Sequence, residues 1–450
     1  MRTIVIGAGN SGRNLALRLS EEGHDAVLVD HRPGALKEAQ SRMDVLTIEG
    51  HGCSPSVLES AGVSNADLLV AVTGDDEVNI LACSIARSAG VAYRAARVGR
   101  DDYFKYPGRI DLAALGVDLA VNPIKACARE LVRLLTLPGT HEVVDLLGGR
   151  ALAAGFTLST QSPLLRVPLK DSSLPGLLST VRFIARDRAG EVQIPSGDTE
   201  FLLGDEVFVV APSAAMGPFL DAAYPDRPRI RKVVISGGTD LGLELARQIE
   251  SETELDVVLL ESDPELAEFV SAKLKRALVL REDLLNADAI PTAGLREDTA
   301  FIATTDDDEA NIISCLVAQK HGVCMTMARV MRPEYAPVIE SLSLLDRAVS
   351  PHLSMMNAIL RFVRGRNVRA AAWLDTLPGE LIEVLIPPGC PWMGREIRSL
   401  KMPRHSIIAS LLREEVARVP TGNSLIEAGD RLVIYALPDA VPKLQTLFRE

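Results

Sequence analysis

Short runs of aliphatic and β-branched residues alternate with amphipathic stretches along residues 1–122. The amphipathic stretches, such as 14–22 and 79–88, place apolar residues on one face of a helix, whereas the runs have the length of buried strands. Alternation of this kind predicts βαβ units around a parallel sheet. The strands are predicted at residues 3–6, 26–29, 45–48, 68–72, 94–97 and 118–121.

The pattern changes after residue 122. Residues 124–135 form a helical stretch with a broad apolar face, so we expect this helix to pack on something outside its own sheet. Residues 140–222 then carry short alternating runs separated by Gly and Pro, which predicts a small α+β domain. Its strands are expected at 142–146, 164–168, 180–186 and 206–210, and a helix at 216–222.

The whole arrangement then occurs a second time. Residues 5–12 are echoed by 235–242, and residues 71–80 return as 303–312. The agreement extends to the far ends of the copies, and the offset stays between 225 and 232 residues throughout. A module of this length has therefore been duplicated, and each copy pairs a strand–helix domain with a small α+β domain.

Composition excludes several classes of protein. Apolar residues make up 47% of the chain and aromatic residues 4%, which is typical of a folded, aliphatic α/β protein. The formal net charge is −12 and no basic stripe is present, so no nucleic-acid partner is expected. No apolar run approaches the roughly 18–20 residues that span a bilayer, and the chain starts directly with a predicted strand, which leaves no room for a signal peptide. We expect a cytoplasmic protein, attached to a membrane only through a partner.

The six cysteines show no C-x-x-C spacing, so neither a zinc site nor a redox motif is indicated. We expect them to be buried, reduced thiols. His51 and Cys53 lie in a Gly-rich turn, without a second His or an acid at catalytic spacing. We interpret this turn as a loop that faces a ligand.

The first copy opens with a glycine turn directly after a predicted strand. Gly7 permits the tight turn, Gly9 lets a pyrophosphate approach the backbone, and Gly12 lets the following helix pack close to the strand. The phosphate then sits over the helix N-terminus, where free N–H groups and the helix dipole favour an anion. Asp30, at the end of the second strand, is suited to ribose hydroxyls and repels a 2′-phosphate. These residues predict a site for NAD or NADH rather than for NADP(H).

The second copy departs from this pattern. Gly237 and Gly242 are kept, but Thr239 stands where the middle glycine would be. Its side chain intrudes where pyrophosphate would approach, and Asp240 adds a like charge beside it. Glu261 still supplies the acid suited to ribose. Two interpretations stay open, a degenerate or altered second site and a working dinucleotide site.

Polar residues also follow later strands of both copies. Thr73 and Thr305 end predicted strands at the carboxyl edge, where ligands bind to open α/β sheets. The acidic run after each threonine either caps a helix N-terminus or forms a cation or partner site. Arg97 and Arg329 end strands that face the same cleft, and each either contacts phosphate or adenine or makes a structural ion pair.

These features predict an α/β fold class, with two tandem copies of a Rossmann-type parallel-sheet domain, each followed by a small α+β domain. The predicted order is a nucleotide-binding domain at 1–122, a packing helix at 123–139, a small domain at 140–224, a second nucleotide-binding domain at 225–350, a packing helix at 351–369 and a second small domain at 370–450.

The motifs and their order resemble a known family. The glycine turn with Asp30, followed by residues 71–73, acids and Asn79, is similar to the domains that regulate potassium conductance, called RCK or KTN domains. The small domain, with residues 194–198 and 204–206, resembles their C-terminal companion. Two such pairs in one chain resemble the NAD-binding peripheral components of bacterial Trk potassium uptake systems, and the resemblance covers essentially the whole chain.

The resemblance implies a regulatory subunit on the cytoplasmic face of the bacterial inner membrane, with a Trk-type membrane potassium-transport subunit as its partner. Family members bind NAD⁺ or NADH, and some respond to ATP and ADP. Their nucleotide-binding domains pair and assemble into a ring of eight, which implies a homotetramer for a chain with two of them. The helices at 123–139 and 351–369 would be interdomain packing helices.

By position, the resemblance also assigns the two sites. The first, with Gly12 added from the glycine pattern, would use Gly7, Ala8, Gly9, Asn10, Ser11, Gly12, Asp30, Thr73, Gly74 and Arg97. The second would use Gly237, Gly238, Thr239, Asp240, Leu241, Glu261 and Arg329. The ligand of the first is NAD or NADH, and that of the second stays open between NAD(H) and ATP or ADP.

We therefore predict a sensor without catalytic residues and without a metal site. Nucleotide binding would change the angle between paired domains and gate the transport subunit, through differential affinity for the two states of the ring. The alternatives are an NAD-dependent oxidoreductase and a structural scaffold with vestigial sites. An oxidoreductase needs a His, Lys or Tyr placed to handle a substrate proton, and no such constellation recurs in both halves.

Overall fold

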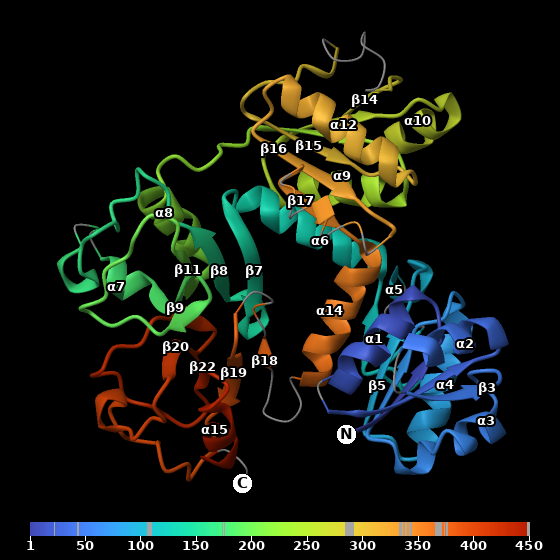
Figure 1. Ribbon diagram of the computed structural model, residues 1–450, viewed down its shortest axis with the longest axis horizontal. Coiled ribbons are helices and arrows are strands. Elements are labelled where there is room, and N and C mark those ends of the chain that lie inside the picture. The colour runs from blue at the N-terminus through green and yellow to red at the C-terminus, as the bar shows by residue number, and fades with distance from the viewer. Residues whose placement is uncertain are drawn as a thin grey trace. The chain divides into compact units, whose positions relative to one another are not determined.

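In the computed structural model, the chain folds into two compact units, and each unit is assembled from both repeats (Figure 1). The first unit contains Met1–Val132 and Arg231–Val363, and the second contains Arg133–Ile230 and Arg364–Glu450. The structure describes all residues except 22, 43–44, 106–109, 173, 175, 284–291, 333–334, 336–337, 340–341, 343, 365–370, 373, 375–376 and 448–450.

The first unit contains a six-stranded parallel sheet from the first repeat, with the strand order β3-β2-β1-β4-β5-β6. β1 and β4 are buried almost throughout, as expected for strands covered by helices on both faces. The strands are Arg2–Ile6 (β1), Asp25–Asp30 (β2), Leu46–Glu49 (β3), Leu68–Ala71 (β4), Tyr93–Arg97 (β5) and Leu119–Val121 (β6). The helices are Asn10–Glu21 (α1), Pro33–Arg42 (α2), Pro55–Ser60 (α3), Asp76–Ser88 (α4), Asp102–Lys105 (α5) and Pro123–Thr136 (α6).

A second parallel sheet in the same unit repeats this order as β14-β13-β12-β15-β16-β17. Its strands are Lys232–Ser236 (β12), Asp256–Leu260 (β13), Leu278–Leu280 (β14), Thr299–Ala303 (β15), Met325–Arg329 (β16) and Arg347–Val349 (β17). Its helices include Asp240–Glu252 (α9), Pro264–Ser271 (α10), Asp308–Lys320 (α12) and Pro351–Arg364 (α14). The prediction of two tandem Rossmann-type sheets is confirmed, and in each the strand order reverses beside the first strand, where ligands bind in such sheets.

Helix α14 of the second repeat packs on the sheet of the first (Figure 1). Met355, Ile359 and Leu360 lie in one buried cluster with Leu15 and Leu28. Full burial of an aliphatic side chain contributes about 1.5–3 kcal/mol, so this face holds the two repeats together. Of the helix predicted at 351–369, residues 365–369 lie outside the described residues.

The second unit contains two five-stranded antiparallel sheets, β10-β9-β11-β8-β7 and β18-β19-β22-β20-β21. Their apolar faces share one core, in which Phe208 and Val210 meet Leu381 and Tyr435. The first sheet contains Thr140–Leu146 (β7), Ala151–Thr157 (β8), Arg182–Arg188 (β9), Glu191–Gln193 (β10) and Glu206–Pro212 (β11), with helices Leu177–Thr180 (α7) and Ser213–Ala223 (α8). The second contains Ala371–Ala372 (β18), Glu380–Leu385 (β19), Ser406–Arg413 (β20), Val416–Arg418 (β21) and Arg431–Ala436 (β22), with helix Val441–Leu447 (α15).

The strand predicted at 164–168 is wrong. Leu165 and Pro168 make only isolated bridges to the segment around Phe201. Arg166 has a φ of +57°, which no strand residue adopts, and Pro168 has no N–H to donate. The place in the sheet belongs instead to β8, whose small apolar residues show no alternation that would have marked them as a strand.

All six cysteines are free thiols. Three of them are buried as expected, whereas Cys53, Cys324 and Cys390 are half-buried, so the expectation of uniformly buried thiols was wrong. Among the described residues, no helix combines the length and the apolar character needed to cross a membrane.

Candidate functional site

A tight turn joins β1 to α1 at the point where the strand order of the first sheet reverses. Gly7 has a φ of +101°, and a Cβ at this position would lie 3.1 Å from the Thr73 nitrogen. A Cβ at Gly12 would lie only 1.8 Å from the Gly7 carbonyl oxygen, whereas one at Gly9 would have no atom within 4 Å. Gly7 and Gly12 are therefore required by the fold, and Gly9 leaves open space above the turn.

Asp30 reaches this turn from the end of β2. Its carboxylate is buried, and Oδ2 accepts the N–H of Ala8 at 2.6 Å. Oδ1 accepts the N–H of Arg32 at 2.8 Å, and the Arg32 guanidinium donates to both carboxylate oxygens at 3.1 and 3.0 Å. Burial by itself raises the pKa of Asp30, but the hydrogen bonds from Arg32 and the backbone outweigh it and lower the pKa to about 2. Asp30 is thus an anion bound to the turn.

A hydrogen-bonded network links the carboxyl ends of β4 and β5. The Asn79 side chain is fully buried and accepts hydrogen bonds from the Thr73 nitrogen at 3.0 Å and from Thr73 Oγ1 at 2.7 Å. Asn79 Nδ2 donates to the carbonyl oxygens of Thr73 and Arg97. Arg97 Nη1 donates to the Thr73 carbonyl at 2.9 Å. The network holds Thr73 and Arg97 beside the glycine turn, as the sequence predicted for this edge of the sheet.

In the acidic run after Thr73, the carboxylates of Asp75 and Asp76 accept hydrogen bonds from backbone N–H groups. Asp75 caps α4 by accepting the N–H of Val78 at 3.0 Å. Asp76 is buried, and both of its carboxylate oxygens accept the N–H of Gly99 at 2.9 Å. The matching acids of the second repeat make the corresponding contacts. Asp75 and Asp307 thus cap their helices, the first of the two interpretations, whereas Asp76 and Asp308 bind the loop after the next strand. The described residues form no metal-binding cluster of three or more such groups.

In the second glycine turn, the side chain of Thr239 bonds to the backbone around the start of α9. Thr239 Oγ1 accepts the N–H of Gly242 at 3.3 Å and donates to the Thr304 carbonyl at 2.8 Å. The hydroxyl therefore occupies the N-terminus of α9, where a phosphate would bind. Asp240 is the exposed first residue of this helix. A Cβ at Gly242 would lie 2.0 Å from the Gly237 carbonyl oxygen, so the fold requires this glycine as it requires Gly12.

Glu261 takes the place of Asp30 in the second repeat. Its Oε2 accepts the N–H of Gly238 at 2.6 Å, and its Oε1 accepts the N–H of Asp263 at 2.8 Å. No arginine bonds to this carboxylate among the described residues. Leu241 has a completely buried side chain, so only its backbone could meet a ligand.

The arginines at the two sites differ in their partners. Arg329 is buried and its Nη1 donates to Asp306 Oδ1 at 2.7 Å. Asp306 stands where the first repeat has Gly74, and a Cβ at Gly74 would meet no atom within 4 Å. Within the described part of the chain, Arg97 makes no ion pair. The first site therefore retains a positive charge that the second one neutralises.

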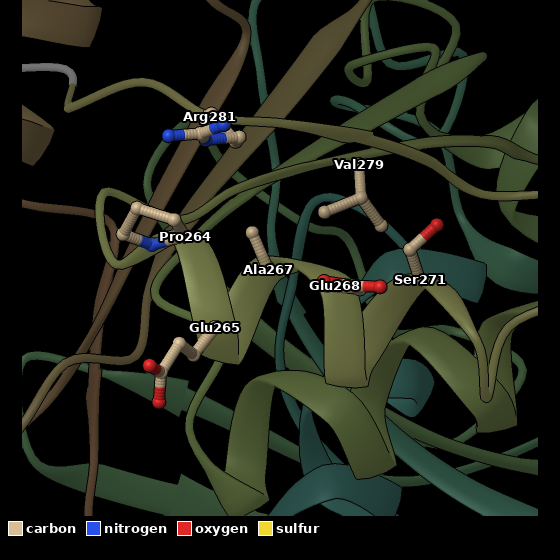
Figure 2. A pocket seen from close by; sticks show the side chains of 7 residues that line it. All are labelled: Pro264, Glu265, Ala267, Glu268, Ser271, Val279 and Arg281. Atoms are coloured by element: carbon tan, nitrogen blue, oxygen red, sulfur yellow. The ribbon is translucent and has the colours of Figure 1, made fainter.

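A separate pocket of about 320 Å³ lies between α10 and β14 (Figure 2). It is lined by Pro264, Glu265, Ala267, Glu268, Ser271, Val279 and Arg281. None of these residues belongs to either predicted site, so the pocket is not part of the glycine turns.

The structure brings most of the predicted first-site residues together. Ala8 and Asp30 are hydrogen-bonded, Arg97 donates to the Thr73 carbonyl, and a Cβ at Gly7 would lie against Thr73. Asn10 and Ser11 begin α1; Asn10 Oδ1 accepts a hydrogen bond from Arg13 at 2.9 Å, and Ser11 Oγ lies 2.9 Å from Nδ1 of His352.

Three residues at this site were missed by the sequence reasoning. Arg32 follows Asp30, the acid predicted to bind ribose, by two positions, and this closeness was a usable signal. Asn79 was noted in the motif and the repeat but was not assigned to the site, although it recurs as Asn311 with the same four hydrogen bonds. His352 lies 341 positions from its partner Ser11, and nothing local marks it.

Two domain families match the chain. The TrkA-N domain matches residues 3–123 and 233–351, and the TrkA-C domain matches residues 154–221 and 381–449. The Trk system potassium uptake protein TrkA of Azorhizobium caulinodans is 30% identical over 455 residues, which cover 100% of this chain and 99% of the relative. The TrkA of Haemophilus influenzae is 28% identical over 458 residues, with coverage of 100% and 99%.

Solved structures share the fold at lower identity. The GsuK channel bound to NAD superposes with a TM-score of 0.63 at 16% identity, covering 100% of this chain and 79% of the channel chain. The GsuK RCK domain superposes with a TM-score of 0.61 at 16% identity, with coverage of 100% and 95%. At this level of identity the likeness concerns the fold alone.

Proposed function

The chain belongs to the family of proteins built from TrkA-N and TrkA-C domains, and from this premise we propose that it is a regulatory subunit of potassium uptake that binds NAD or NADH at its first glycine turn. Its relatives over the full length bear the name of Trk system potassium uptake proteins. In this proposal it gates a Trk-type membrane subunit from the cytoplasmic face and catalyses no reaction.

The combination of groups at the first turn carries the proposal. Gly9 leaves space over the N-terminus of α1, where a pyrophosphate gains from the free N–H groups and the helix dipole. Asp30 is an ionised acceptor for ribose hydroxyls, and Arg97 is a cation without an acidic partner in the described residues. A dinucleotide needs these groups together, because its pyrophosphate is an anion and its ribose is a hydrogen-bond donor.

We propose that the second turn is closed to pyrophosphate. The Thr239 hydroxyl occupies the helix N-terminus, and Asp306 neutralises Arg329. Asp240 adds an exposed negative charge beside the turn. Each of these differences opposes an anionic ligand, and all three act in the same direction.

Gating needs only modest contacts at each site. Moving a two-state equilibrium from 1:99 to 99:1 takes about 5.5 kcal/mol of differential binding. In a homotetramer that forms a ring of eight nucleotide-binding domains, four first sites would share this as about 1.4 kcal/mol each, which is about tenfold in affinity. Leu81 on α4 and Ile313 on α12 occupy matching positions of the repeats and are 49% and 50% exposed. An exposed apolar residue at the same place in both repeats supports assembly through the outer faces of α4 and α12.

Potassium uptake in cells tests the proposal. Wild type, Asp30→Ala and the matched control Glu261→Ala are expressed in a strain that lacks its own copy of the protein. The proposal expects Asp30→Ala to lose NADH binding in vitro and to alter uptake, whereas Glu261→Ala keeps both. Wild-type binding and uptake in Asp30→Ala would overturn the site assignment.

A further inference from the structure

A histidine of the second repeat lies at the first glycine turn. His352 is the second residue of α14, and its Nδ1 lies 2.9 Å from Ser11 Oγ. Ser11 is the second residue of α1, so it belongs to the helix N-terminus on which a phosphate would rest. The imidazole is half-buried. The imidazole therefore comes from the second repeat and is not among the motif residues of the first repeat.

The packing of α14 fixes the position of His352. The helix follows β17 of the second sheet, and its apolar face, including Met355 and Met356, is buried against the first (Figure 1). Two residues further along, Ser354 Oγ donates to Glu130 Oε2 on α6 at 2.6 Å. His352 is thus held at the turn by a rigid element rather than by a loop.

The charges around His352 are unbalanced. Arg97 from β5 and Arg329 from β16 are the charged groups that act on it, and Asp306 is already paired with Arg329. Burial, followed by the fields of these two arginines, lowers the pKa of His352 below its ordinary value. The positive end of the α1 dipole has the same sign. In the absence of an anion, His352 is neutral near pH 7.

The other copy has no such group. The repeats align Pro351 with Pro123, so Ile124 stands where the second repeat has His352. The titratable residue therefore occurs only in the copy that faces the open glycine turn.

We propose that His352 completes the first nucleotide site as a group that takes up a proton when a nucleotide phosphate binds at the N-terminus of α1. This inference rests on the proposed function. The phosphate offsets the field of the two arginines, and the imidazolium formed with a proton from the solvent donates to a phosphate oxygen. Nucleotide affinity therefore rises as the pH falls, and a bound nucleotide ties the second repeat more firmly to the first.

The size of the effect follows from linkage. Each unit by which the pKa of His352 rises on binding corresponds to about a tenfold gain in affinity below both pKa values. Titration calorimetry with NADH at about pH 6 and about pH 8, where histidine changes its charge, should show about three- to tenfold tighter binding at the lower pH. Repeating the titration in buffers of different ionisation enthalpy should show proton uptake.

Three variants separate the titration from the packing. H352Q keeps a hydrogen-bonding side chain toward Ser11 but cannot take up a proton, so its affinity should not depend on pH. H352K carries a fixed charge, so its affinity at about pH 8 should match that of the wild type at about pH 6. H31Q removes the exposed imidazole beside Asp30 and should keep the pH dependence of the wild type.

The outcomes are distinguishable. If the wild type binds NADH with no pH dependence, if H352Q retains the dependence, or if H31Q abolishes it, the role of His352 is overturned and the proposed function stands. If the wild type binds no NADH at any pH, the proposed function fails and this inference falls with it.

Discussion

Two glycines of the first turn should respond to alanine in opposite ways. In Gly12→Ala the new Cβ would lie 1.8 Å from the Gly7 carbonyl oxygen, which is backbone and cannot rotate away. In Gly9→Ala the new Cβ meets no protein atom within 4 Å, and the backbone of Gly9 is not in the left-handed region. The first change therefore stresses the fold, and the second fills only the space assigned to the ligand.

The magnitudes follow from the contacts. To relieve Gly12→Ala, α1 must move away from β1 by about 1 Å, and overpacking of this kind costs about 1–3 kcal/mol or more. For a unit of this size each kcal/mol lowers Tm by about 2–4 °C, which gives roughly 2–12 °C. Gly9→Ala should change stability by less than about 1 kcal/mol. It should nevertheless weaken NADH binding at least about tenfold, which corresponds to about 1.4 kcal/mol.

Calorimetric melting and NADH titration of the two variants and the wild type test this reasoning. Gly12→Ala should melt early, and Gly9→Ala should melt with the wild type but bind poorly. A Gly12→Ala protein that melts with the wild type would refute the packing argument. Wild-type affinity in Gly9→Ala would refute the placement of the pyrophosphate.

Further predictions concern Asp30, Arg32 and the second turn. Asp30→Ala frees the Arg32 guanidinium for a 2′-phosphate, so NADPH should bind this variant more tightly than it binds the wild type, and adding Arg32→Ala should reverse this; an unchanged NADPH affinity counts against the pairing. Asp30→Asn should lower the free energy of unfolding by up to about 2.6 kcal/mol at neutral pH. The folded pKa is about 2 and the unfolded one about 3.9, so in urea titrations the difference from wild type should be full above about pH 5 and vanish toward pH 2. A difference that does not depend on pH would exclude the ionised carboxylate as its cause. Thr239→Gly combined with Asp306→Gly gives the second turn the pattern of the first and should add a second NADH per chain in calorimetry. A stoichiometry that stays unchanged would show that other groups close the turn.

The parallel sheets and the first turn could be predicted because their signals are local. Buried strands followed by turn residues mark β1 and β4, and the positive φ of Gly7 and the contact of Gly12 with the Gly7 carbonyl oxygen arise within one strand–turn–helix unit. The unequal second turn was also visible, since Thr239 stands in a position that repetition defines. The sequence spacing could not predict the hydrogen bonds of the Thr239 hydroxyl or the ion pair between Asp306 and Arg329, because both depend on side-chain geometry.

Other features depend on contacts between distant segments. His352 reaches Ser11 because α14 packs on the sheet of the other repeat. The run at 164–168 looks like a strand, but Arg166 adopts a positive φ as the chain bends toward Phe201. In both cases tertiary packing decides the outcome, and a pattern read along the chain cannot report it.

The central claim is that the first repeat alone senses the dinucleotide. The number of NADH molecules bound per chain, measured by titration calorimetry of the full-length protein, tests it most directly. The claim predicts one NADH per chain, lost in Asp30→Ala and retained in Glu261→Ala. Two NADH molecules per chain in the wild type, or loss of binding in Glu261→Ala with retention in Asp30→Ala, would contradict it.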